Sequence, residues 1–280
     1  GAATCRVLAQ AGACVIVHYG QSAGEAQAAV QEIGEGRATA LGGDLSQAGI
    51  AASLFRDAVA WKGRVDVLVN NAGIFPSASV DDPQVQWDEI WSRTLQVNLI
   101  AAADLCREAI LHFRTRGGGT IVNVASRAAF RGDTPDAMHY AASKGGLISL
   151  TKSIARGYAR EGILAYAIAP GWVSTDMAEE YLRDHAADIA RDIPLGEAAP
   201  PEDIGRMARL MVELRKPWHA LRLAKAAAAK GVIYPAAYYP LTGLEGKPLG
   251  LPPELVMAIA RRESEFNHTV SSHAGALGLM

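Results

Sequence analysis

The chain has 280 residues, of which 50% are hydrophobic and 20% are charged, and its formal net charge is −2 at pH 7. This composition is typical of a globular protein with ample material for a core. The near-neutral charge and the lack of a basic stripe exclude a general attraction to nucleic acid, and no apolar run reaches the ~20 residues of a membrane span. We therefore expect neither nucleic acid nor a membrane as a partner.

Three cysteines, Cys5, Cys14 and Cys106, lie far apart and lack CxxC spacing. The pattern argues against a disulfide framework and against a structural zinc site, so we expect no metal. We interpret the cysteines as small, buried, apolar side chains of a protein in a reducing compartment.

Short apolar runs alternate with amphipathic segments over the first 212 residues. The opening GAATCRVLAQ already has helical apolar spacing, and strands are predicted at 14–19, 37–45, 65–71, 119–126 and 163–170. Helices are predicted near 22–33, 46–62, 88–114 and 138–161. Because β-branched strands alternate with helices, we expect an α/β fold, a Rossmann-like, doubly wound parallel sheet with helices on both faces.

The alternation stops near residue 212. The sequence then runs ELRKPWHALRLAKAAAAKGVIYPAAYYPL, which predicts a helix followed by a connector rich in Gly, Pro and Tyr. PPELVMAIARRESEF predicts another helix that begins at a proline. We expect an α/β domain over residues 1–212 and a small α-helical segment over residues 213–280.

Tyr140 and Lys144 in YAASK are four residues apart, so they share one face of a predicted helix. A free tyrosine has a pKa of about 10, which is too high for efficient proton exchange at neutral pH. A lysine ammonium held alongside favours the phenolate and lowers that pKa. An isolated YxxxK pattern is short enough to be an ordinary helix surface, so its surroundings have to decide between the two interpretations.

Polar residues follow several of the predicted strands. Ser126 ends the run VNVAS, and its hydroxyl can donate a hydrogen bond to a carbonyl oxygen as charge develops there. Asn98 lies in a predicted helix, while NNAG (70–73) and PGWVSTDM (170–177) each follow a strand. In an open parallel sheet the ligand crevice lies at the carboxyl ends of the strands, so we expect these segments to line one site.

Taken together and in this order, NNAG, Asn98, Ser126, YAASK and PGWVSTDM make residues 1 to about 212 resemble a short-chain dehydrogenase/reductase. The resemblance implies Tyr140 as general acid/base and Lys144 as the residue that holds the nicotinamide ribose and lowers the tyrosine pKa. It implies Ser126 on the substrate carbonyl and Asn98 as the residue that places a relay water. The implied reaction interconverts a small-molecule ketone and secondary alcohol, for example a 3-oxoacyl thioester and its reduced form.

The resemblance also implies these cofactor-binding positions: Gly1, Asp44, Leu45, Asn71, Ala72, Gly73, Tyr140, Lys144, Pro170, Gly171, Val173 and Thr175. Asp44 has a second interpretation, as a cap at a strand end. The segment HYGQS (18–22) has no acidic residue to hold a ribose 2′-OH, and it offers Ser22. These features favour NADP, and the lack of an arginine there leaves NAD open.

Gly1 aligns with the last glycine of the TGxxxGIG loop near the start of this family's sequences. We expect the first strand and most of the phosphate-binding loop to be absent, which would leave two unpaired strand edges inside the sheet. The family's last strand and glycine-rich tail do not follow PEDIGRMARLM either. The residues for the chemistry are encoded, and we expect the truncation to impair it.

Residues from about 213 to 280 are similar to part of a soluble lytic transglycosylase, on the residues AIARRESEFN (258–267) and SSHAGALGLM (271–280). The resemblance implies Glu263 as the acid that cleaves the glycan of peptidoglycan, since a glutamate in an apolar groove can protonate a glycosidic oxygen. In the other interpretation RRESE is a solvated helix face of alternating charge. The sequence stops within the motif, so we expect no transglycosylase activity.

The two resemblances imply different compartments, because NADPH is found in the cytoplasm and peptidoglycan lies outside the inner membrane. We expect a cytoplasmic chain formed by a truncated join of two genes, with the function of an NAD(P)-dependent oxidoreductase. The alternatives are peptidoglycan cleavage through Glu263 and a non-catalytic chimeric fragment. The family's assembly implies a homo-oligomer built on the helices at 88–114 and 138–161.

Overall fold

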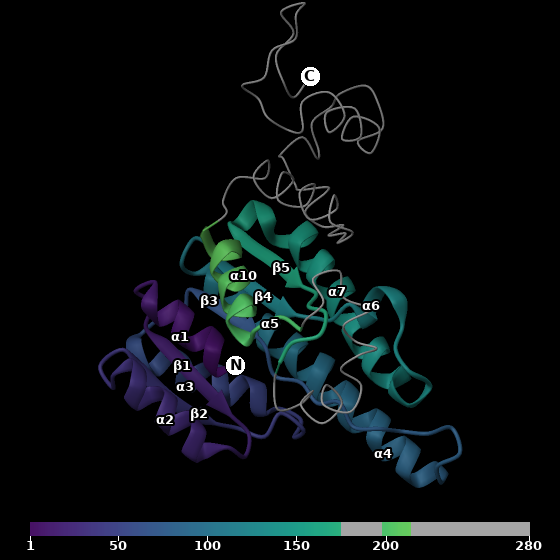
Figure 1. Cartoon of the computed structure of the whole chain (residues 1–280). Helices are drawn as coiled ribbons and strands as arrows, with labels where there is room; N and C mark the ends of the chain where they lie inside the picture. Colours follow the sequence, from purple (N-terminus) through teal and green to yellow (C-terminus); the bar gives the residue numbers. More distant parts are fainter. Residues whose placement is uncertain (175–197, 214–280) are drawn as a thin grey trace, which may run out of the picture. The chain divides into compact units, whose positions relative to one another are not determined.

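The computed structural model describes residues 1–174 and 198–213 (Figure 1). The chain divides between Val212 and Glu213 into two units, at the place where the alternation of strands and helices stops in the sequence. Nearly all described residues belong to the first unit. Glu263 and the predicted helices of the second unit lie outside the described residues.

Strands and helices alternate along the first unit, and each predicted strand is found within a few residues of its expected place. The described strands are β1 (Val15–Tyr19), β2 (Ala38–Gly42), β3 (Val67–Asn70), β4 (Gly119–Val124) and β5 (Ile163–Ile168). The described α-helices are α1 (Ala2–Gln10), α2 (Ala23–Ile33), α3 (Ile50–Lys62), α4 (Gln84–Leu95), α5 (Ala101–Arg114), α6 (Ala128–Arg131), α7 (Met138–Tyr158) and α10 (Pro201–Glu213). Shorter turns are η1 (Gln96–Ile100), η2 (Pro135–Ala137) and η3 (Ala159–Glu161).

All described strand pairs are parallel, as the sequence predicts. β1 pairs with β2, and β4 lies between β3 and β5. The described strands form two sheets, one of two strands and one of three, because β1 and β3 do not pair with each other. A Rossmann-like fold has one continuous sheet, so the structure differs from the expectation at this place. Among the described strands, β1 and β3 are each hydrogen-bonded along one edge, which agrees with the expectation of two unpaired edges.

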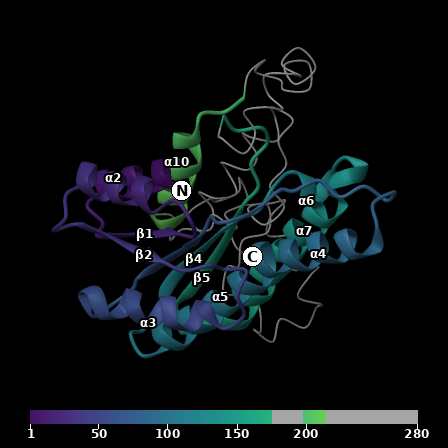
Figure 2. The ribbon, with the colours of Figure 1, turned by 90° about the horizontal axis from the view of Figure 1, so that it is seen from below.

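Helices cover both faces of the strands, so the doubly wound architecture is confirmed (Figure 2). On one face, α1 and α2 pack on β1 and β2, with Val17 and Val30 in the buried cluster. On the other face, α3, α5 and α7 share a larger cluster that includes Phe113 and Ile121, both completely buried. Met207 of α10 packs on the opposite face of the three-stranded sheet. The strands are thus buried between two helical layers, as parallel sheets require.

The predicted helix at 88–114 is two helices joined by a π-helical turn. It begins at Gln84, earlier than expected, directly after Pro83, whose fixed φ of −54° suits a helix start. At η1 the N–H of Ala101 bonds to the carbonyl oxygen of Gln96, five residues back. Such turns are frequent at functional sites, and this one contains Asn98.

The cysteine expectation is only partly confirmed. Cys106 is buried and Cys5 is half-buried, but Cys14 is exposed because it lies in the connection between α1 and β1. Among the helices of residues 1–174 and 198–213, none is long and apolar enough to cross a membrane.

Candidate active site

The carboxyl ends of β4 and β5 meet the start of α7. Ala125, just after β4, donates its backbone N–H to the carbonyl oxygen of Ile168 at the end of β5, at 2.7 Å. Lys144 of α7 donates to the carbonyl oxygen of Val124 at 2.9 Å. The residues that follow these strands therefore share one edge of the sheet, the edge at which open parallel sheets bind ligands.

Tyr140 lies at the centre of this group, one helical turn before Lys144. The Nζ of Lys144 is 5.6 Å from the centroid of the Tyr140 ring. The hydroxyl of Ser126 lies close enough to the Tyr140 phenol to influence its pKa, and it also accepts the backbone N–H of Ala128 at 3.1 Å. Phe75 packs edge-on against the Tyr140 ring, with 4.7 Å between the centroids and 89° between the planes. The fold thus brings together three of the four predicted catalytic side chains, from the end of β4 and from α7.

Lys144 is buried to a degree that is rare for lysine, with 4% of its surface exposed. Burial disfavours the charged form and lowers the pKa of Lys144 from 10.5 to about 8. An ammonium has three N–H donors, and among the described residues the bond to Val124 uses one of them. The other two donors can serve a polar ligand at this edge of the sheet.

The pKa of Tyr140 is raised above its ordinary value of 10.0, chiefly by burial. The nearby hydroxyl of Ser126 acts in the opposite sense and lowers this pKa, and the charge of Asp133 adds to the increase. The Lys144 ammonium is directed to the carbonyl oxygen of Val124 and is not among the causes of this shift, so its effect on the Tyr140 pKa stays a prediction. Tyr140 is a neutral phenol at pH 7, which is the form that donates a proton.

Asn98 is 1% exposed, and its amide group is occupied by protein partners. Its Oδ1 accepts the N–H of Ile74 at 2.8 Å, and its Nδ2 donates to the carbonyl oxygen of Ile74 at 2.9 Å. Nδ2 also donates to Ser143 Oγ at 3.2 Å, and Ser143 donates to the carbonyl oxygen of Tyr140 at 2.7 Å. Asn98 thus fixes the segment after β3 relative to α7, and its role in placing a relay water stays a prediction.

Glycines at the predicted cofactor site allow close approaches. A Cβ on Gly73 would lie 3.3 Å from both Asn98 Oδ1 and Lys144 Nζ, and a Cβ on Gly1 would lie 3.3 Å from Asn71 Nδ2. The neighbouring Ala72 is exposed. The lack of a side chain at Gly73 therefore keeps clear the space beside the buried ammonium. A ribose, with its several hydroxyl acceptors, fits a cationic donor reached through such a gap.

Asp44 and Leu45 follow β2 and differ in their surroundings. The exposed Asp44 carboxylate accepts the backbone N–H of Ser46 at 2.9 Å, and its hydrogen bonds to Ser46 lower its pKa. This is the strand-end cap of its second interpretation. Leu45 is buried in the core, packed with residues of α3, so its side chain does not line the crevice. A cofactor contact at Leu45 would have to use its backbone.

The segment after β5 is held by hydrogen bonds of its backbone. Arg127, the residue after Ser126, donates its N–H to the carbonyl oxygen of Pro170 at 2.9 Å. Gly171 comes next, and Val173 forms a parallel bridge with the residues that precede α10. Thr175 lies outside the described residues. The predicted nicotinamide loop is thus tied to the end of β4, as far as the structure describes it.

The structure contains a buried polar network behind the site that was not predicted from the sequence. Asn70 Nδ2 donates to Asn123 Oδ1 at 2.8 Å and to Cys106 Sγ at 3.3 Å, while Asn123 Nδ2 donates to Thr151 Oγ1 at 2.8 Å. Burial raises the pKa of Cys106 to about 12, so its thiol is neutral. A signal was present, since Asn123 interrupts the apolar run TIVNV, and a polar residue inside a buried strand needs partners.

The model of a protein family described as short chain dehydrogenase matches residues 1–186. The chain belongs to the short-chain dehydrogenase family. Every described strand of the unit lies within the match, as do the four predicted catalytic residues. The chain is therefore an oxidoreductase by family, and the fold expected from its sequence is the fold of its relatives.

Relatives of this short-chain dehydrogenase differ in their substrates. The chain is 33% identical over 214 residues to a 3-oxoacyl-[acyl-carrier-protein] reductase of Synechocystis sp., covering 75% of this chain and 83% of the relative. It is 37% identical over 214 residues to a 3beta-hydroxysteroid dehydrogenase 1 of Eggerthella lenta, covering 74% and 80%. A gluconate 5-dehydrogenase from Burkholderia cenocepacia J2315, solved in complex with NADP and tartrate, is similar with a TM-score of 0.68 and 28% identity, covering 76% and 84%.

A second family model, the transglycosylase SLT domain, matches residues 244–280. The resemblance to a transglycosylase is therefore confirmed over a short stretch, which begins later than the predicted boundary of this segment. Glu263 lies within the match and outside the described residues.

Proposed function

We propose that this short-chain dehydrogenase interconverts a small-molecule ketone and secondary alcohol with an NAD(P) cofactor. The observation that carries the proposal is the arrangement of Tyr140, a half-buried phenol that lies near the Ser126 hydroxyl and has the buried ammonium of Lys144 5.6 Å from its ring centroid. When bound, the nicotinamide supplies or accepts the hydride. The residues of the chain bind the substrate oxygen and manage its proton.

In the reductive direction, Ser126 donates a hydrogen bond to the substrate oxygen as negative charge develops on it. Tyr140 is protonated at neutral pH because burial raises its pKa, and it gives its proton to that oxygen. Lys144 then stabilises the phenolate that remains. With a pKa of about 8, Lys144 is mostly an ammonium at pH 7. In the oxidative direction the same proton returns to Tyr140.

NADP is the favoured cofactor, and NAD stays open. Ser22, exposed at the start of α2, supports NADP, as does the similarity to a gluconate 5-dehydrogenase that was solved with NADP. The proposed cofactor contacts are Tyr140 and Lys144 at the nicotinamide ribose, Gly1, Asn71, Ala72 and Gly73 along the ribose and phosphates, Asp44 and Leu45 at the adenine, and Pro170, Gly171, Val173 and Thr175 at the nicotinamide.

The proposed substrate class is a 3-oxoacyl thioester, which is supported by the similarity to a 3-oxoacyl-[acyl-carrier-protein] reductase. The test is oxidation of NADPH by the whole chain with a 3-oxoacyl thioester, compared between the wild type, Tyr140→Phe and Tyr158→Phe. Tyr158 lies at the far end of α7, where its ring contacts Arg114. Tyr140→Phe should lower kcat by at least ~100-fold, the usual worth of a general acid, and Tyr158→Phe should not. Equal activity of all three proteins would refute Tyr140 as the proton donor.

Peptidoglycan cleavage through Glu263 is the second candidate, and the family match over residues 244–280 supports it. Clearing in a peptidoglycan zymogram by the wild type, but not by Glu263→Gln, would establish it, and no clearing by the wild type would remove it. Dehydrogenase activity that disappears in Tyr140→Phe would remove the third candidate, a non-catalytic chimeric fragment.

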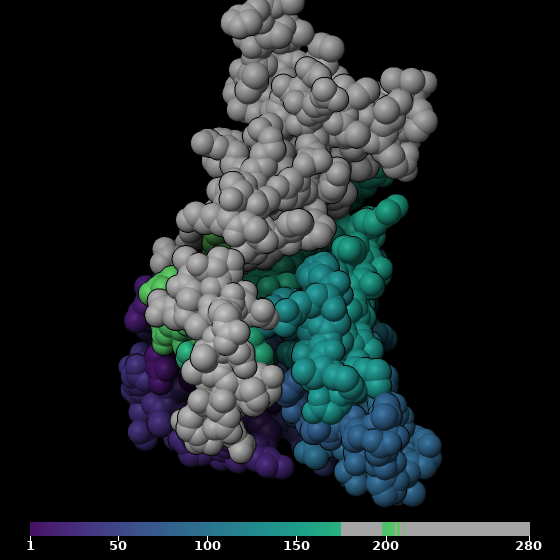
Figure 3. Space-filling view, turned by 45° about the vertical axis from the view of Figure 1, so that its right-hand side comes forward, coloured from purple at the N-terminus to yellow at the C-terminus, as the bar shows by residue number. Residues whose placement is uncertain are grey.

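A homo-oligomer in the cytoplasm, where NADPH is found, completes the proposal, with the helices at 88–114 and 138–161 as its interface. The blue surface of α4 protrudes from the unit in Figure 3. Val85 of α4, Ile100 of η1 and Leu111 of α5 are 79%, 46% and 44% exposed, so these helices have large apolar side chains that a partner subunit could cover. Sedimentation equilibrium that finds a monomer at every concentration would contradict this interface.

A further inference from the structure

His139 directly precedes Tyr140 and is completely buried, and the reaction derived above gives it no task. Its Nε2 lies 2.9 Å from the carbonyl oxygen of Pro76, in the segment between β3 and α4. A carbonyl oxygen can only accept, so Nε2 carries the hydrogen and donates it. The bond ties the first turn of α7 to the segment that follows NNAG.

The other ring nitrogen of His139, Nδ1, is buried and has no hydrogen-bond partner among the described residues. Trp91 of α4 lies against the ring, with 5.9 Å between the ring centroids. A buried unpaired nitrogen is unfavourable, so an apolar side chain would fill the same space at less cost. What histidine adds at this position is the hydrogen bond to Pro76.

Phe75 lies between two fixed backbone positions. On one side, both polar groups of the Ile74 backbone are bonded to the Asn98 side chain. On the other side, the carbonyl oxygen of Pro76 is bonded to His139. The ring held between them is the one that packs edge-on against Tyr140.

Further bonds connect the same two segments. Ala78 donates its backbone N–H to the carbonyl oxygen of Asp136 at 2.8 Å, and Ser77 Oγ donates to the Asp136 carboxylate at 2.8 Å. The bond between the Ser77 and Asp136 side chains lies toward the surface, since Ser77 is exposed and Asp136 is half-buried, whereas Ala78 is 1% exposed. Among these bonds, the one from His139 is made to Pro76, the residue directly after Phe75.

We propose that His139 is a positioning residue, whose hydrogen bond to Pro76 holds Phe75 edge-on against Tyr140 and so fixes the orientation of the proton donor. The proposal rests on the proposed function of Tyr140. An edge-to-face contact has a preferred geometry and restrains the ring that it touches. Proton transfer depends on a hydroxyl held in the right direction, and small misplacements reduce the rate strongly.

The test is ¹⁹F NMR of the whole chain labelled with 3-fluorotyrosine, in which the Tyr140 signal is the one that Tyr140→Phe removes. His139→Leu keeps a buried side chain and removes the donor. We expect the Tyr140 signal to shift and broaden, and kcat to fall on the order of 10- to 100-fold with little change in the KM of the substrate. His139→Gln restores an N–H donor, and it should restore the signal and most of kcat.

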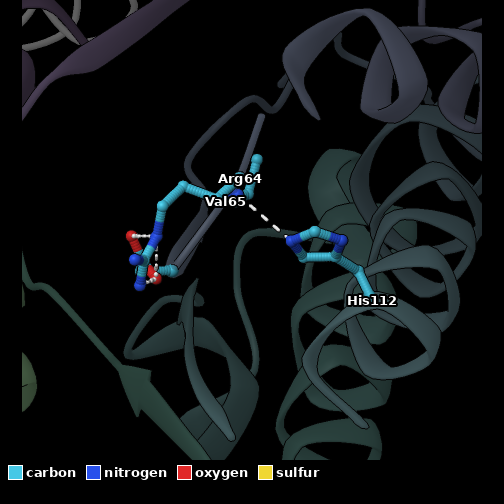
Figure 4. A network of polar contacts seen from close by, with 4 residues as sticks. Arg64, Val65 and His112 are labelled. Atoms are coloured by element: carbon cyan, nitrogen blue, oxygen red, sulfur yellow. Dashed lines mark hydrogen bonds and ion pairs between the residues drawn. The ribbon is translucent and has the colours of Figure 1, made fainter. Parts of the chain in front are cut away.

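His112 provides a matched control. Its Nε2 accepts the backbone N–H of Val65 at 3.2 Å, at the amino end of β3 and so at the end opposite the site (Figure 4). His112→Leu also removes a ring nitrogen from a backbone partner. It should leave the Tyr140 signal where it is in the wild type.

An unchanged Tyr140 signal in folded His139→Leu overturns the proposal, as does an equal shift in His112→Leu. If His139→Leu does not fold, His139→Gln decides, because a displaced Tyr140 signal in that folded variant overturns the proposal and a wild-type signal supports it. An inactive wild type would count against the proposed function alone, since the position of the signal does not depend on turnover.

Discussion

Replacing Lys144 by methionine should separate the stability of this fold from its chemistry. Methionine keeps most of the length and packing of the lysine stem and removes the ammonium. The ammonium is unfavourable at this position, since burial lowers its pKa from 10.5 to about 8. The variant should lose dehydrogenase activity and also lose a pH dependence of stability that the wild type has.

The sign and size of that pH dependence follow from the pKa. Between pH 8 and pH 10.5 the unfolded lysine binds a proton that the folded one has lost, so the free energy of unfolding rises with pH in this window. For a single group with these two pKa values, the rise between pH 7 and pH 10 is about 2.5 kcal/mol. At pH 7 the buried charge of Lys144 lowers the free energy of unfolding by about 3 kcal/mol, and the methionine variant regains this amount. In the variant the carbonyl oxygen of Val124 loses its partner, which lowers the free energy of unfolding by about 1–3 kcal/mol. Lys144→Met should therefore be at least as stable as the wild type at pH 7.

The assay is urea unfolding followed by circular dichroism at both pH values, for the wild type, Lys144→Met and Lys152→Met. Lys152 lies on the same helix and is exposed, so its variant should keep the pH dependence of the wild type. The reasoning is refuted if Lys144→Met shows the same rise with pH as the wild type. It is also refuted if the variant is less stable at pH 7 by more than about 1 kcal/mol, a clear effect for a single substitution.

Three further substitutions test other parts of the structure. Gly73→Ala adds a Cβ 3.3 Å from both Asn98 Oδ1 and Lys144 Nζ. We expect a folded protein whose affinity for NADPH, measured by fluorescence, falls by at least ~10-fold. Unchanged affinity would place the cofactor elsewhere. Gly157→Ala, within α7 and with open space around the new Cβ, should raise the free energy of unfolding by about 0.5–1 kcal/mol, and a lower melting temperature would contradict this. Asn123→Leu removes two buried side-chain hydrogen bonds of 2.8 Å, one with Asn70 and one with Thr151, and should lower the free energy of unfolding by about 2 kcal/mol in urea titrations. A neutral effect would mean that the network does not stabilise the core.

The strands and the catalytic residues could be predicted because their signals are local. Runs such as CVIVHY and GTIVNVAS combine β-branched residues with clear ends, and each contains a strand within two residues of its predicted bounds. Tyr140 and Lys144 share a helix face by their spacing alone. The edge at which Ser126 meets them follows from the rule that parallel strands end together.

Features that depend on tertiary contacts could not be predicted in the same way. The raised pKa of Tyr140 comes from burial, and the direction of the Lys144 ammonium is set by a carbonyl oxygen of another element. The π-helical turn that contains Asn98 interrupts a helix whose apolar spacing continues through it. The role proposed for His139 could not be predicted from the sequence, because it depends on a hydrogen bond to Pro76 that only the fold brings about.

The measurement that tests the central claim most directly is a fluorescence titration of the whole chain with NADPH and with NADH. The account predicts saturable binding in the micromolar range, tighter for NADPH and weakened by Gly73→Ala. A chain that is folded by circular dichroism and binds neither cofactor would contradict the claim that Tyr140 and Lys144 line a working nicotinamide site.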